Sequence, residues 1–594
     1  MSEPSAAQPD HNFSDSRQRA WAIFFVSVLG LFLEMMLIRW ISTEIRIFAY
    51  LQNAVLVVCV LGLGMGCLTS RGPFSVRRVL IPLLILVLLV AIPVTRVVVR
   101  AISPMLGVLE DFVIWNQAVS SQPVQSVLLL TLGLVLTAVL TGLIWYVFVP
   151  IGRLLGRLID QEPRTIRAYT LNVAGSLAGI WLFVGVSALQ QPPVIWFLIV
   201  AGLLLFFLSR SRPARLVEAG LIAALVVLSV PLGRDAGAKA VTWSPYQKLV
   251  LRETSTTGGR IGQIGQFLVE VNNTDHQEIL NLSPARTIDT RYQPPEMEGL
   301  SQYDLPALIH PRPRRILIVG AGSGNDVAGA LRQGAEEVTA VEIDPVILEW
   351  GRRYHPEKPY DSPRVRIVND DARSFLATDQ GQYDVISFGL LDSHTTTSMT
   401  NARLDHFVYT REGIERAKAH LADGGVIIMN FFANRPFIAD RMASVMRLAF
   451  GEEPFVFIVP PTGFGRGGVF FVGGNLPMVR QQIAANARLS PLLDKWRSEY
   501  AVPLTYTTRV ATDDWPYVYL RQPSIPTLHF LLALLVAILF VAGLRLAGVT
   551  REAYRWSKPE WHFAFLGAAF LLLEVQNITK ASVVLGNTWL VNAV

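Results

Sequence analysis

Three closely spaced glycines and an acid further along the chain form the part of the sequence best suited to chemistry. Residues 315–319 are an apolar run that leads into Gly320, Gly322 and Gly324, and a second apolar run ends in Glu342. Glycine lets the backbone approach a ligand closely, and an acid at the end of the second strand can accept hydrogen bonds from ribose hydroxyls. We therefore predict a nucleoside-binding unit made of a strand, a helix and a second strand.

Several strand-length runs alternate with helical stretches around this unit. The helical stretches include 325–333 and 345–354, so the strands should lie parallel with helices on both faces of one sheet. In such sheets ligands bind beyond the carboxyl ends of the strands. The expected strands are 315–319, 337–342, 365–370, 383–388 and 425–430.

Chemically useful residues fall at four of these strand ends. Besides the glycine loop and Glu342, they include Asp370 and Asp371 after the third strand and Asp392 after the fourth. A dinucleotide-binding fold is the nearest alternative, but its third glycine would fall at Asn325. Four converging strand ends support a ligand site more strongly than the glycines alone do.

Further motifs in this part of the chain point to one family. They are Ser244-Pro245-Tyr246-Gln247, Tyr303, His310-Pro311, Val341-Glu342-Ile343-Asp344-Pro345, Asp371-Ala372-Arg373 and Tyr383-Asp384. With them, residues 243–475 resemble the spermidine synthase family, whose fold is that of the S-adenosylmethionine-dependent methyltransferases. The flanks, including 169–179 and 512–516, are similar to multi-spanning bacterial relatives. The resemblance implies a Rossmann-like parallel sheet with a small N-terminal β subdomain.

The resemblance also implies an adenosine-containing cofactor, S-adenosylmethionine or its decarboxylated form, and no metal. Glu342 would then hold the ribose, Asp371 and Ala372 would border the adenine, and the glycines would line the methionine-derived part. The complete set of implied cofactor residues is Gly320, Gly322, Gly324, Asp326, Glu342, Ile343, Asp371 and Ala372. The implied substrate residues are Tyr246, Gln247, Tyr303 and Asp392.

One departure from the family concerns the reacting amine. Aminopropyltransferases of the family carry an acid at the end of the fourth strand, and the aligned residue here is Gly389. An amine that attacks a carbon next to a sulfonium has to lose a proton, and a carboxylate or histidine can accept it. We predict that Asp392 and His394 take this role, although a histidine in such a loop more often serves only in hydrogen bonding. Arg403 and Asp405 belong either to the same mouth or to an ordinary loop ion pair.

The composition places most of the remaining chain in lipid. The 594 residues are 51% hydrophobic and 16% charged, with a mean hydropathy of +0.39. The first apolar run contains Glu34 and lacks a small-residue cleavage site, so we expect a retained helix and not a signal peptide. Nine runs approach spanning length, namely 21–38, 51–68, 79–99, 124–149, 168–189, 194–208, 216–232, 528–546 and 563–584.

Three regions follow from these runs. We expect a membrane region of about seven helices over 1–235, an α/β region over 240–522 and a second membrane segment of two helices or more over 527–594. The β subdomain should occupy 243–300 and the Rossmann-like core 310–475. Within 168–189, Gly175 and Gly179 should permit close helix packing.

Charge distribution bears on partners and on membrane orientation. The net charge is +6, but acidic residues outnumber basic ones 32 to 29 within 243–522, so nucleic acid is an unfavourable partner. Alternate short loops of the membrane regions are basic, which is typical of an inner-membrane, multi-pass protein. With a cytoplasmic N terminus this pattern places the α/β region outside the cytoplasm, whereas a cytosolic nucleoside requires the opposite. The side therefore stays open.

Glu34 and Glu574 are acids within apolar runs, where a carboxylate is costly and marks a functional residue or a structural ion pair. The leading hypothesis is a membrane-anchored transferase that moves an aminopropyl group to a small amine. Its alternatives are a catalytically silent nucleoside-binding or scaffold domain of a transport or assembly protein, and a methyltransferase. The lipid bilayer is the expected partner. The acceptor amine and the oligomeric state are not determined, and a homo-oligomer is compatible with the sequence.

Overall fold

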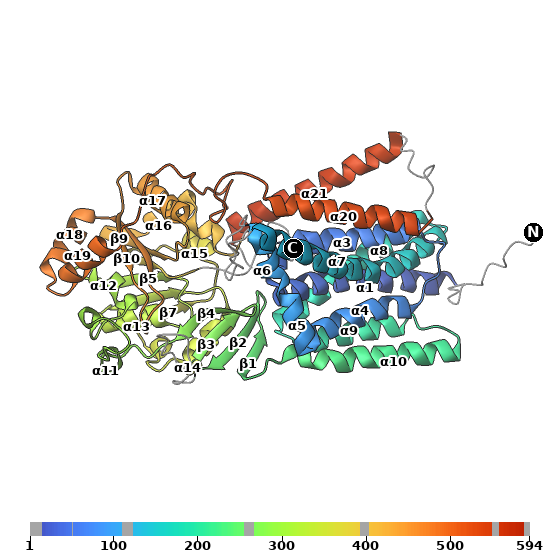
Figure 1. Cartoon of the computed structure of the whole chain (residues 1–594), viewed down its shortest axis with the longest axis horizontal. Helices are drawn as coiled ribbons and strands as arrows, with labels where there is room; N and C mark the ends of the chain where they lie inside the picture. The colour runs from blue at the N-terminus through green and yellow to red at the C-terminus, as the bar shows by residue number, and fades with distance from the viewer. Residues whose placement is uncertain are drawn as a thin grey trace, which may run out of the picture. The chain divides into compact units, whose positions relative to one another are not determined.

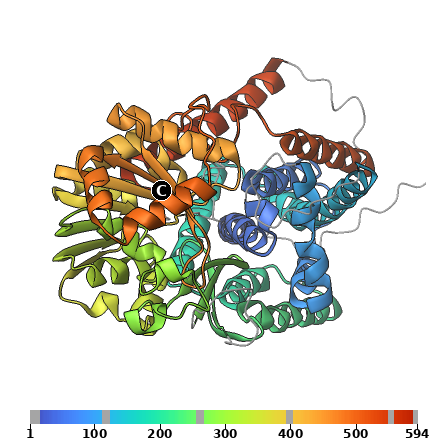
Figure 2. The same ribbon diagram turned by 60° about the vertical axis from the view of Figure 1, so that its left-hand side comes forward.

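The computed structural model of the chain describes residues 15–49, 51–109, 123–254, 267–391, 403–548 and 558–586. These residues divide into two compact units, which are drawn in Figure 1 and, after a turn, in Figure 2. A helical unit comprises residues up to 236 together with 525–574. An α/β unit comprises 237–524 and the segment from 575 onward.

The helical unit consists of long apolar helices and short connecting ones. The last of them, α21, runs across the boundary between the two units. The helices are α1 (Ser16–Glu44), α2 (Arg46–Ala49), α3 (Gln52–Leu68), α4 (Val76–Ala91), α5 (Pro93–Arg100), α6 (Ile102–Leu106), α7 (Pro123–Asp160), α8 (Thr165–Ala188), α9 (Pro193–Leu205), α10 (Arg212–Ser229), α20 (Thr527–Leu546) and α21 (Lys558–Leu585).

Helix length and composition identify membrane-crossing candidates among the described residues. Five helices are long and apolar enough to cross a bilayer, namely α1, α7, α8, α10 (with its 3-10 extension) and α20. The apolar run 79–99 is divided between α4 and α5, and the stretch Pro93–Leu109, which begins with α5, meets α4 at an angle of 91°. The break follows from Pro93, because proline offers no N–H and disfavours helical backbone at the preceding residue. The number of actual spans stays a prediction.

Small residues allow two helix pairs to pack closely. A methyl group built on Gly175 of α8 would lie 2.5 Å from the carbonyl oxygen of Phe24, and one on Gly179 would lie 2.6 Å from that of Val28. Both carbonyls belong to α1, so the expectation that these two glycines permit close helix packing is confirmed. Gly152 of α7 approaches α3 in the same way.

The α/β unit begins with a four-stranded antiparallel sheet. Its strands are β1 (Ala238–Trp243), β2 (Lys248–Glu253), β3 (Phe267–Val271) and β4 (Thr274–Ile279), in chain order. A tight turn with positive φ at Asn272 and Asn273 joins β3 to β4. The apolar face of this sheet packs on Val346, Ile347 and Trp350 of α14 (Pro345–Tyr354). The small sheet is thereby fixed next to the main one.

The main sheet has seven strands in the order β10-β11-β9-β8-β5-β6-β7. Strands β5 to β9 pair in parallel, and β11 and β10 extend the sheet antiparallel at one edge. The predicted strands 315–319 and 383–388 match β5 and β8, and the antiparallel edge is an addition to the parallel sheet that was expected. The strands are β5 (Arg315–Val319), β6 (Glu337–Val341), β7 (Val365–Val368), β8 (Tyr383–Phe388), β9 (Leu421–Phe431), β10 (Phe455–Val459) and β11 (Gly468–Gly474).

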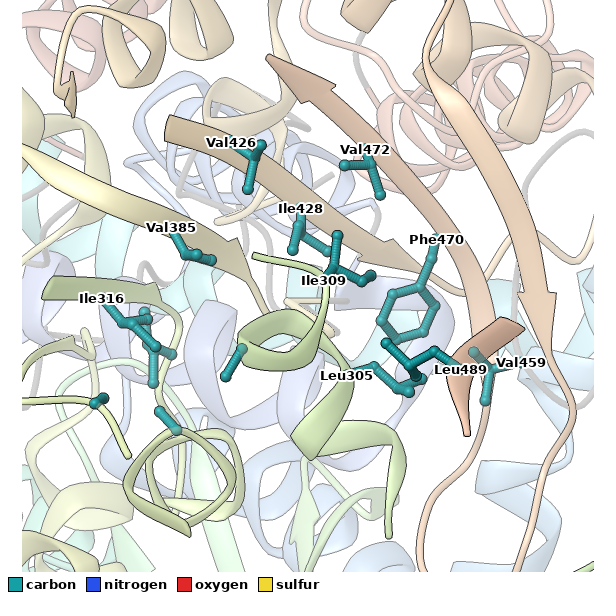
Figure 3. Close-up of a cluster of buried hydrophobic side chains, with 14 of the residues drawn as sticks. Leu305, Ile309, Ile316, Val385, Val426, Ile428, Val459, Phe470, Val472 and Leu489 are labelled. Atoms are coloured by element: carbon teal, nitrogen blue, oxygen red, sulfur yellow. The ribbon is translucent and has the colours of Figure 1, made fainter. Parts of the chain in front are cut away.

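Both faces of the main sheet are buried. On one face Ile316, Val385 and Ile428 join a core that Figure 3 shows reaching Leu305 and Leu489. Successive side chains of β5 point to opposite faces of the sheet, and every residue after Arg315 is inaccessible to solvent. The second face is therefore buried as well. The covering helices include α12 (Leu305–Leu308), α13 (Asn325–Arg332), α15 (Ala372–Thr378), α16 (Arg411–Lys418), α17 (Pro436–Phe450), α18 (Leu476–Ala485) and α19 (Leu489–Glu499).

Candidate functional site

The glycine loop lies at the carboxyl end of β5, where its three glycines all have left-handed backbone. The φ angles are +72° at Gly320, +54° at Gly322 and +102° at Gly324. The N–H groups of Gly320 and Ala321 both donate to the carbonyl of Val341, at 2.9 Å each. Residues other than glycine rarely adopt this backbone conformation. The glycines are therefore required by conformation as well as by the limited space above the loop.

Glu342, directly after β6, points its carboxylate at this loop. One oxygen accepts the backbone N–H of Gly322 at 2.9 Å, and the other accepts the N–H of Asp344 at 2.9 Å. The residue is 8% exposed, and burial raises the pKa of its carboxyl to about 7. A carboxylate has about four lone-pair positions, and the backbone N–H groups of Gly322, Ile343 and Asp344 do not use all of them, so a donor such as a ribose hydroxyl can still be accepted. The acid therefore fits a sugar-binding role.

Two side chains that sequence reasoning missed hold the loop in place. The Tyr360 hydroxyl donates to the carbonyl of Gly322 at 2.6 Å. The Gln277 side-chain oxygen accepts from both the backbone N–H and the hydroxyl of Ser323, at 3.2 Å each. Gln277 comes from the small sheet, so no spacing within the glycine motif could have indicated it.

Leu391 provides an apolar wall above the loop. A methyl group built on Gly320 would lie only 1.5 Å from Leu391 Cδ2, so this side chain packs directly on the glycine backbone. On Gly322 the equivalent position is 2.5 Å from the Gln277 side-chain oxygen. An apolar side chain and a polar one thus occupy the space over Gly320 and Gly322, next to the Glu342 carboxylate.

The predicted substrate residue Gln247 has a partner close to the loop. Its amide donates to Asp344 at 3.1 Å, and the Ser244 hydroxyl donates to the same carboxylate at 2.7 Å. Asp344 in turn caps the first turn of α14 by accepting the N–H of Val346. The segment with Tyr246 and Gln247 therefore links the small sheet to Asp344, close to Glu342. A role of this segment in binding a substrate stays a prediction.

Asp371 and Ala372, predicted to border the adenine, form the start of α15. The Asp371 carboxylate accepts the N–H of Arg373 at 2.8 Å and that of Ser374 at 3.2 Å. It is 3% exposed and serves as the N-cap of that helix. The position after β7 agrees with the edge of the predicted pocket, and contact with a base stays a prediction, as does the role of Ile343.

Asp326 lies next to Gly389, directly after β8. Its carboxylate Oδ2 is 3.5 Å from the position that a Cβ atom at Gly389 would take. Tyr303 is nearby, since burial and the Asp326 carboxylate together raise the pKa of its hydroxyl. Arg466 interacts electrostatically with Tyr303 and with His276. The structure thus brings the predicted residues Asp326 and Tyr303 together at the end of β8.

The two predicted catalytic residues, Asp392 and His394, lie outside the described residues, which resume at Arg403. Beyond that gap, Asp405 accepts the Tyr519 hydroxyl at 2.7 Å, and the Arg403 guanidinium lies 3.7 Å from the centre of the Tyr519 ring. Both residues are buried, at 3% exposure. Arg403 and Asp405 are therefore joined through Tyr519, which was not anticipated.

The remaining predicted features concern metals and the membrane acids. Within the described ranges, no group of three or more His, Cys, Asp or Glu side chains is arranged to hold a metal. Glu34 is buried in α1 at 4% exposure, whereas the side chain of Glu574 lies outside the described residues. In the same unit, Glu44 pairs with Arg100 at 2.9 Å.

Comparison with known proteins assigns the α/β unit. The profile of the Spermine/spermidine synthase domain matches residues 302–476, from η4 (Gln302–Asp304) before β5 through β11. The chain contains a spermine/spermidine synthase domain. This synthase domain includes the glycine loop, Glu342 and Gly389, but not the strand that carries Gln277.

Several curated polyamine aminopropyltransferases are similar to the chain. Polyamine aminopropyltransferase 1 of Streptomyces coelicolor is 24% identical over 454 residues, which cover 71% of this chain and 76% of the relative. The enzyme of Korarchaeum cryptofilum is 28% identical over 130 residues, and polyamine aminopropyltransferase 1 of Pseudomonas aeruginosa is 32% identical over 145. The chain spans only 38% and 49% of the length of these two.

The Streptomyces match extends beyond the synthase domain. Residues 237–524 make up about half of the chain, so a match to 71% of it has to include part of the helical unit. Among solved structures, spermidine synthase from Thermotoga maritima is 16% identical with a TM-score of 0.31 and covers 50% of this chain and 88% of that one.

Proposed function

We propose that the α/β unit binds an S-adenosyl donor and transfers its aminopropyl group to a small amine. The proposal is supported by the synthase domain and by the relatives named polyamine aminopropyltransferase. The single observation that carries it is the Glu342 carboxylate, which faces the glycine loop while keeping lone pairs free for sugar hydroxyls.

The donor, when bound, supplies a carbon made electrophilic by an adjacent sulfonium. Glu342 would accept hydrogen bonds from the ribose and so orient the nucleoside along the ends of β5 and β6. Gly320 and Gly322 allow the backbone to come close, and Tyr360 and Gln277 keep the loop rigid. Leu391 would exclude water from the apolar side of the mouth. Acids on the β8 side would attract the positively charged amine.

Nucleoside binding can be tested with 5′-methylthioadenosine, a thioether that contains the adenosine and sulfur of the donor. The full-length protein in detergent should show a melting temperature that rises and then saturates with ligand, because binding to the native state stabilises it. Glu342→Gln should weaken this binding about 10- to 100-fold, since hydrogen bonds to a charged group are the stronger ones. Glu349→Gln, an exposed acid on α14, is the matched control.

The proposed nucleoside site is contradicted if the wild-type protein does not bind 5′-methylthioadenosine, or if Glu342→Gln binds it as tightly as the wild-type protein does. Product mass distinguishes the transfer chemistry once binding is established, because aminopropyl transfer and methyl transfer add different masses to the amine. A methylated product would replace the aminopropyl proposal with the methyltransferase alternative.

We also propose that the helical unit anchors the protein in the membrane as a multi-pass protein. Five helices of suitable length and composition, among the residues that the structure describes, support this placement. A topology reporter fused near Gln522 tests the side of the α/β unit. A cytoplasmic signal agrees with access to an S-adenosyl donor, and an external signal would contradict transfer from a cytosolic one.

A second candidate function is a silent nucleoside-binding domain in a transport protein. Gly389, which provides no carboxylate at the end of β8, and Glu34, buried inside α1, both favour it. Under this alternative Glu34→Gln abolishes flux of the transported species, and the protein turns over no S-adenosyl compound. Turnover by the wild-type protein would exclude the silent alternative.

A further inference from the structure

The end of β8 has space for a side chain but lacks one. Gly389 lies outside the left-handed region, and its N–H donates to the carbonyl of Val319 at 3.1 Å. A Cβ atom there would lie 3.1 Å from the carbonyl oxygen of Gly320 and 3.5 Å from Asp326 Oδ2. A carboxylate on this strand would therefore occupy the region that the Asp326 carboxylate already reaches from α13.

Asp326 differs from the other acids of the mouth in its partners. Glu342, Asp344 and Asp371 each accept hydrogen bonds from backbone N–H groups. Among the residues that the structure describes, Asp326 has no ion-pair partner and no side-chain donor, and its carboxylate accepts a hydrogen bond from its own backbone N–H. A partly buried acid without a side-chain donor is costly in the empty protein and becomes favourable when a cation arrives.

The surroundings of Asp326 fit a small organic cation. The hydroxyls of Tyr303 and Tyr360 both interact electrostatically with it and come from η4 and η5 (Pro359–Asp361). The ring of Tyr303 is only partly buried and provides apolar and π-electron surface for the alkyl chain and charge of an amine, whereas Tyr360 is buried at 4% exposure. Leu391 covers the adjacent Gly320, on the side toward the glycine loop. An acid with aromatic neighbours is a pattern that recognises alkylammonium groups.

We propose that Asp326 binds the acceptor amine and takes its proton, so that the first turn of α13 supplies the carboxylate that Gly389 lacks. This inference rests on the proposed function. The amine nitrogen forms a bond to the aminopropyl carbon of the S-adenosyl donor, and the carbon–sulfur bond breaks. Its electron pair stays on sulfur, which becomes a neutral thioether, and the proton released by nitrogen passes to the Asp326 carboxylate.

The charge state of Asp326 agrees with this role. Burial raises the pKa of its carboxyl to about 7, so the group accepts a proton more readily than an ordinary aspartate does. A proton acceptor works best when its pKa lies near the working pH. The geometry at Gly389 and the absence of a donor carry the inference, and the pKa only supports it.

Direct amine binding tests the inference separately from turnover. The full-length protein in detergent, with 5′-methylthioadenosine present at saturation, is titrated with 1,4-diaminobutane and followed by its melting temperature and by calorimetry. The family resemblance placed Asp326 with the cofactor, whereas its carboxylate lies at the end of β8. We therefore expect Asp326→Asn to weaken diamine binding at least tenfold and to leave 5′-methylthioadenosine binding within about twofold. Asp423→Asn, an exposed aspartate on β9, is the matched control and should bind both probes as the wild-type protein does.

Rescue provides a second variant. Gly389→Asp in the Asp326→Asn background returns a carboxylate to the same space, where its Cβ requires a shift of only a few tenths of an ångström. We expect this double variant to recover diamine binding, and turnover that falls about 100-fold in Asp326→Asn should recover with it. A merely structural role for Asp326 predicts no such recovery.

The outcomes separate the two proposals. If the wild-type protein binds 5′-methylthioadenosine and Asp326→Asn still binds the diamine, the inference is overturned and the nucleoside site stands. If Asp392→Asn loses diamine binding while Asp326→Asn keeps it, the amine carboxylate is Asp392, and the inference is again overturned. Failure of the wild-type protein to bind 5′-methylthioadenosine contradicts the proposed function itself.

Discussion

The candidate site has two halves at the same edge of the main sheet, and they differ in how their polar groups are hydrogen-bonded. At the ends of β5 and β6, glycine backbone and Glu342 form a rigid surface whose polar groups are already bonded to one another. At the end of β8, Gly389 offers no side chain, and Asp326 reaches into the space from a neighbouring helix without a side-chain donor among the described residues. One half is organised in advance, and the other keeps its charge available.

This difference shows that a functional group is defined by its place in space more than by its place in the chain. The nucleoside half depends on backbone conformation, which only glycine at fixed positions allows. The amine half needs one carboxylate at a suitable distance, and either β8 or α13 can deliver it. We expect substitutions in the first half to weaken folding and binding together, and those in the second half to weaken binding without a loss of stability.

Exchange of one glycine in each half gives the largest expected contrast. Gly320→Ala places a methyl group on left-handed backbone, which costs about 1–2 kcal/mol, and 1.5 Å from Leu391 Cδ2, which has to move. Gly389→Ala adds the same group on permissive backbone and should cost less than about 1 kcal/mol. Calorimetric melting and 5′-methylthioadenosine titration of both full-length variants measure this contrast; equal losses of stability would contradict it.

The pH dependence of stability gives an effect of comparable size. Burial raises the pKa of Glu342 to about 7 in the folded protein, so its contribution to stability is full below about pH 4.5 and is lost as pH rises through about 7. We expect the unfolding free energy to fall by on the order of 2–3 kcal/mol over that interval because of this group.

Glu342→Gln should flatten that part of the profile and stabilise the protein at pH 8, although it weakens nucleoside binding. Asp326→Asn should act in the same direction, because burial raises the pKa of Asp326 to about 7 as well. Denaturant unfolding between pH 4 and pH 8 measures both. The expectation is contradicted if the unfolding free energy of the wild-type protein rises between pH 4 and pH 8 and neither variant is more stable at pH 8. That result would mean that both acids are ionised and stabilising in the folded protein.

Removal of one hydroxyl should produce the smallest effect. Tyr360→Phe deletes the hydrogen bond to the carbonyl of Gly322, worth about 1 kcal/mol, and should weaken 5′-methylthioadenosine binding about fivefold. Tyr354→Phe is the control, since the ring of Tyr354 packs on Phe267 at the end of α14. Diamine binding should change little in either variant. A loss of diamine binding equal to that of the nucleoside would show that the two halves are coupled.

Much of the main sheet could be predicted from local pattern. Residues 315–319 and 383–388 are strands as expected, and 345–354 is a helix that starts at Pro345 behind the capping Asp344. Apolar runs of strand length and a proline in the first helical turn are local signals, so they survive tertiary context. The antiparallel strands β10 and β11 were not expected: β11 pairs with β9 across the intervening α17, and β10 pairs with β11.

The helical unit shows the same limit. The apolar run 79–99 has the length of one span, yet it folds as α4 and α5 with a break at Ile92. Hydropathy measures only how apolar a run is, whereas the residue before Pro93 is disfavoured in helical conformation. Gly175 and Gly179, in contrast, were correctly assigned to close packing because small residues at that spacing have few other uses in an apolar helix.

The sequence by itself determined the half of the site that we propose for the nucleoside. Gly320, Gly322, Gly324 and Glu342 are close in the chain, and a strand, a helix and a strand can bring them together in only one way. Tertiary structure alone decided the remainder: Gln277 reaches the loop from another sheet, Tyr360 from a short 3-10 turn, and Asp326 faces the space left by Gly389. The physical reason is that local pattern dictates backbone, whereas contacts between side chains from separate elements depend on how those elements pack.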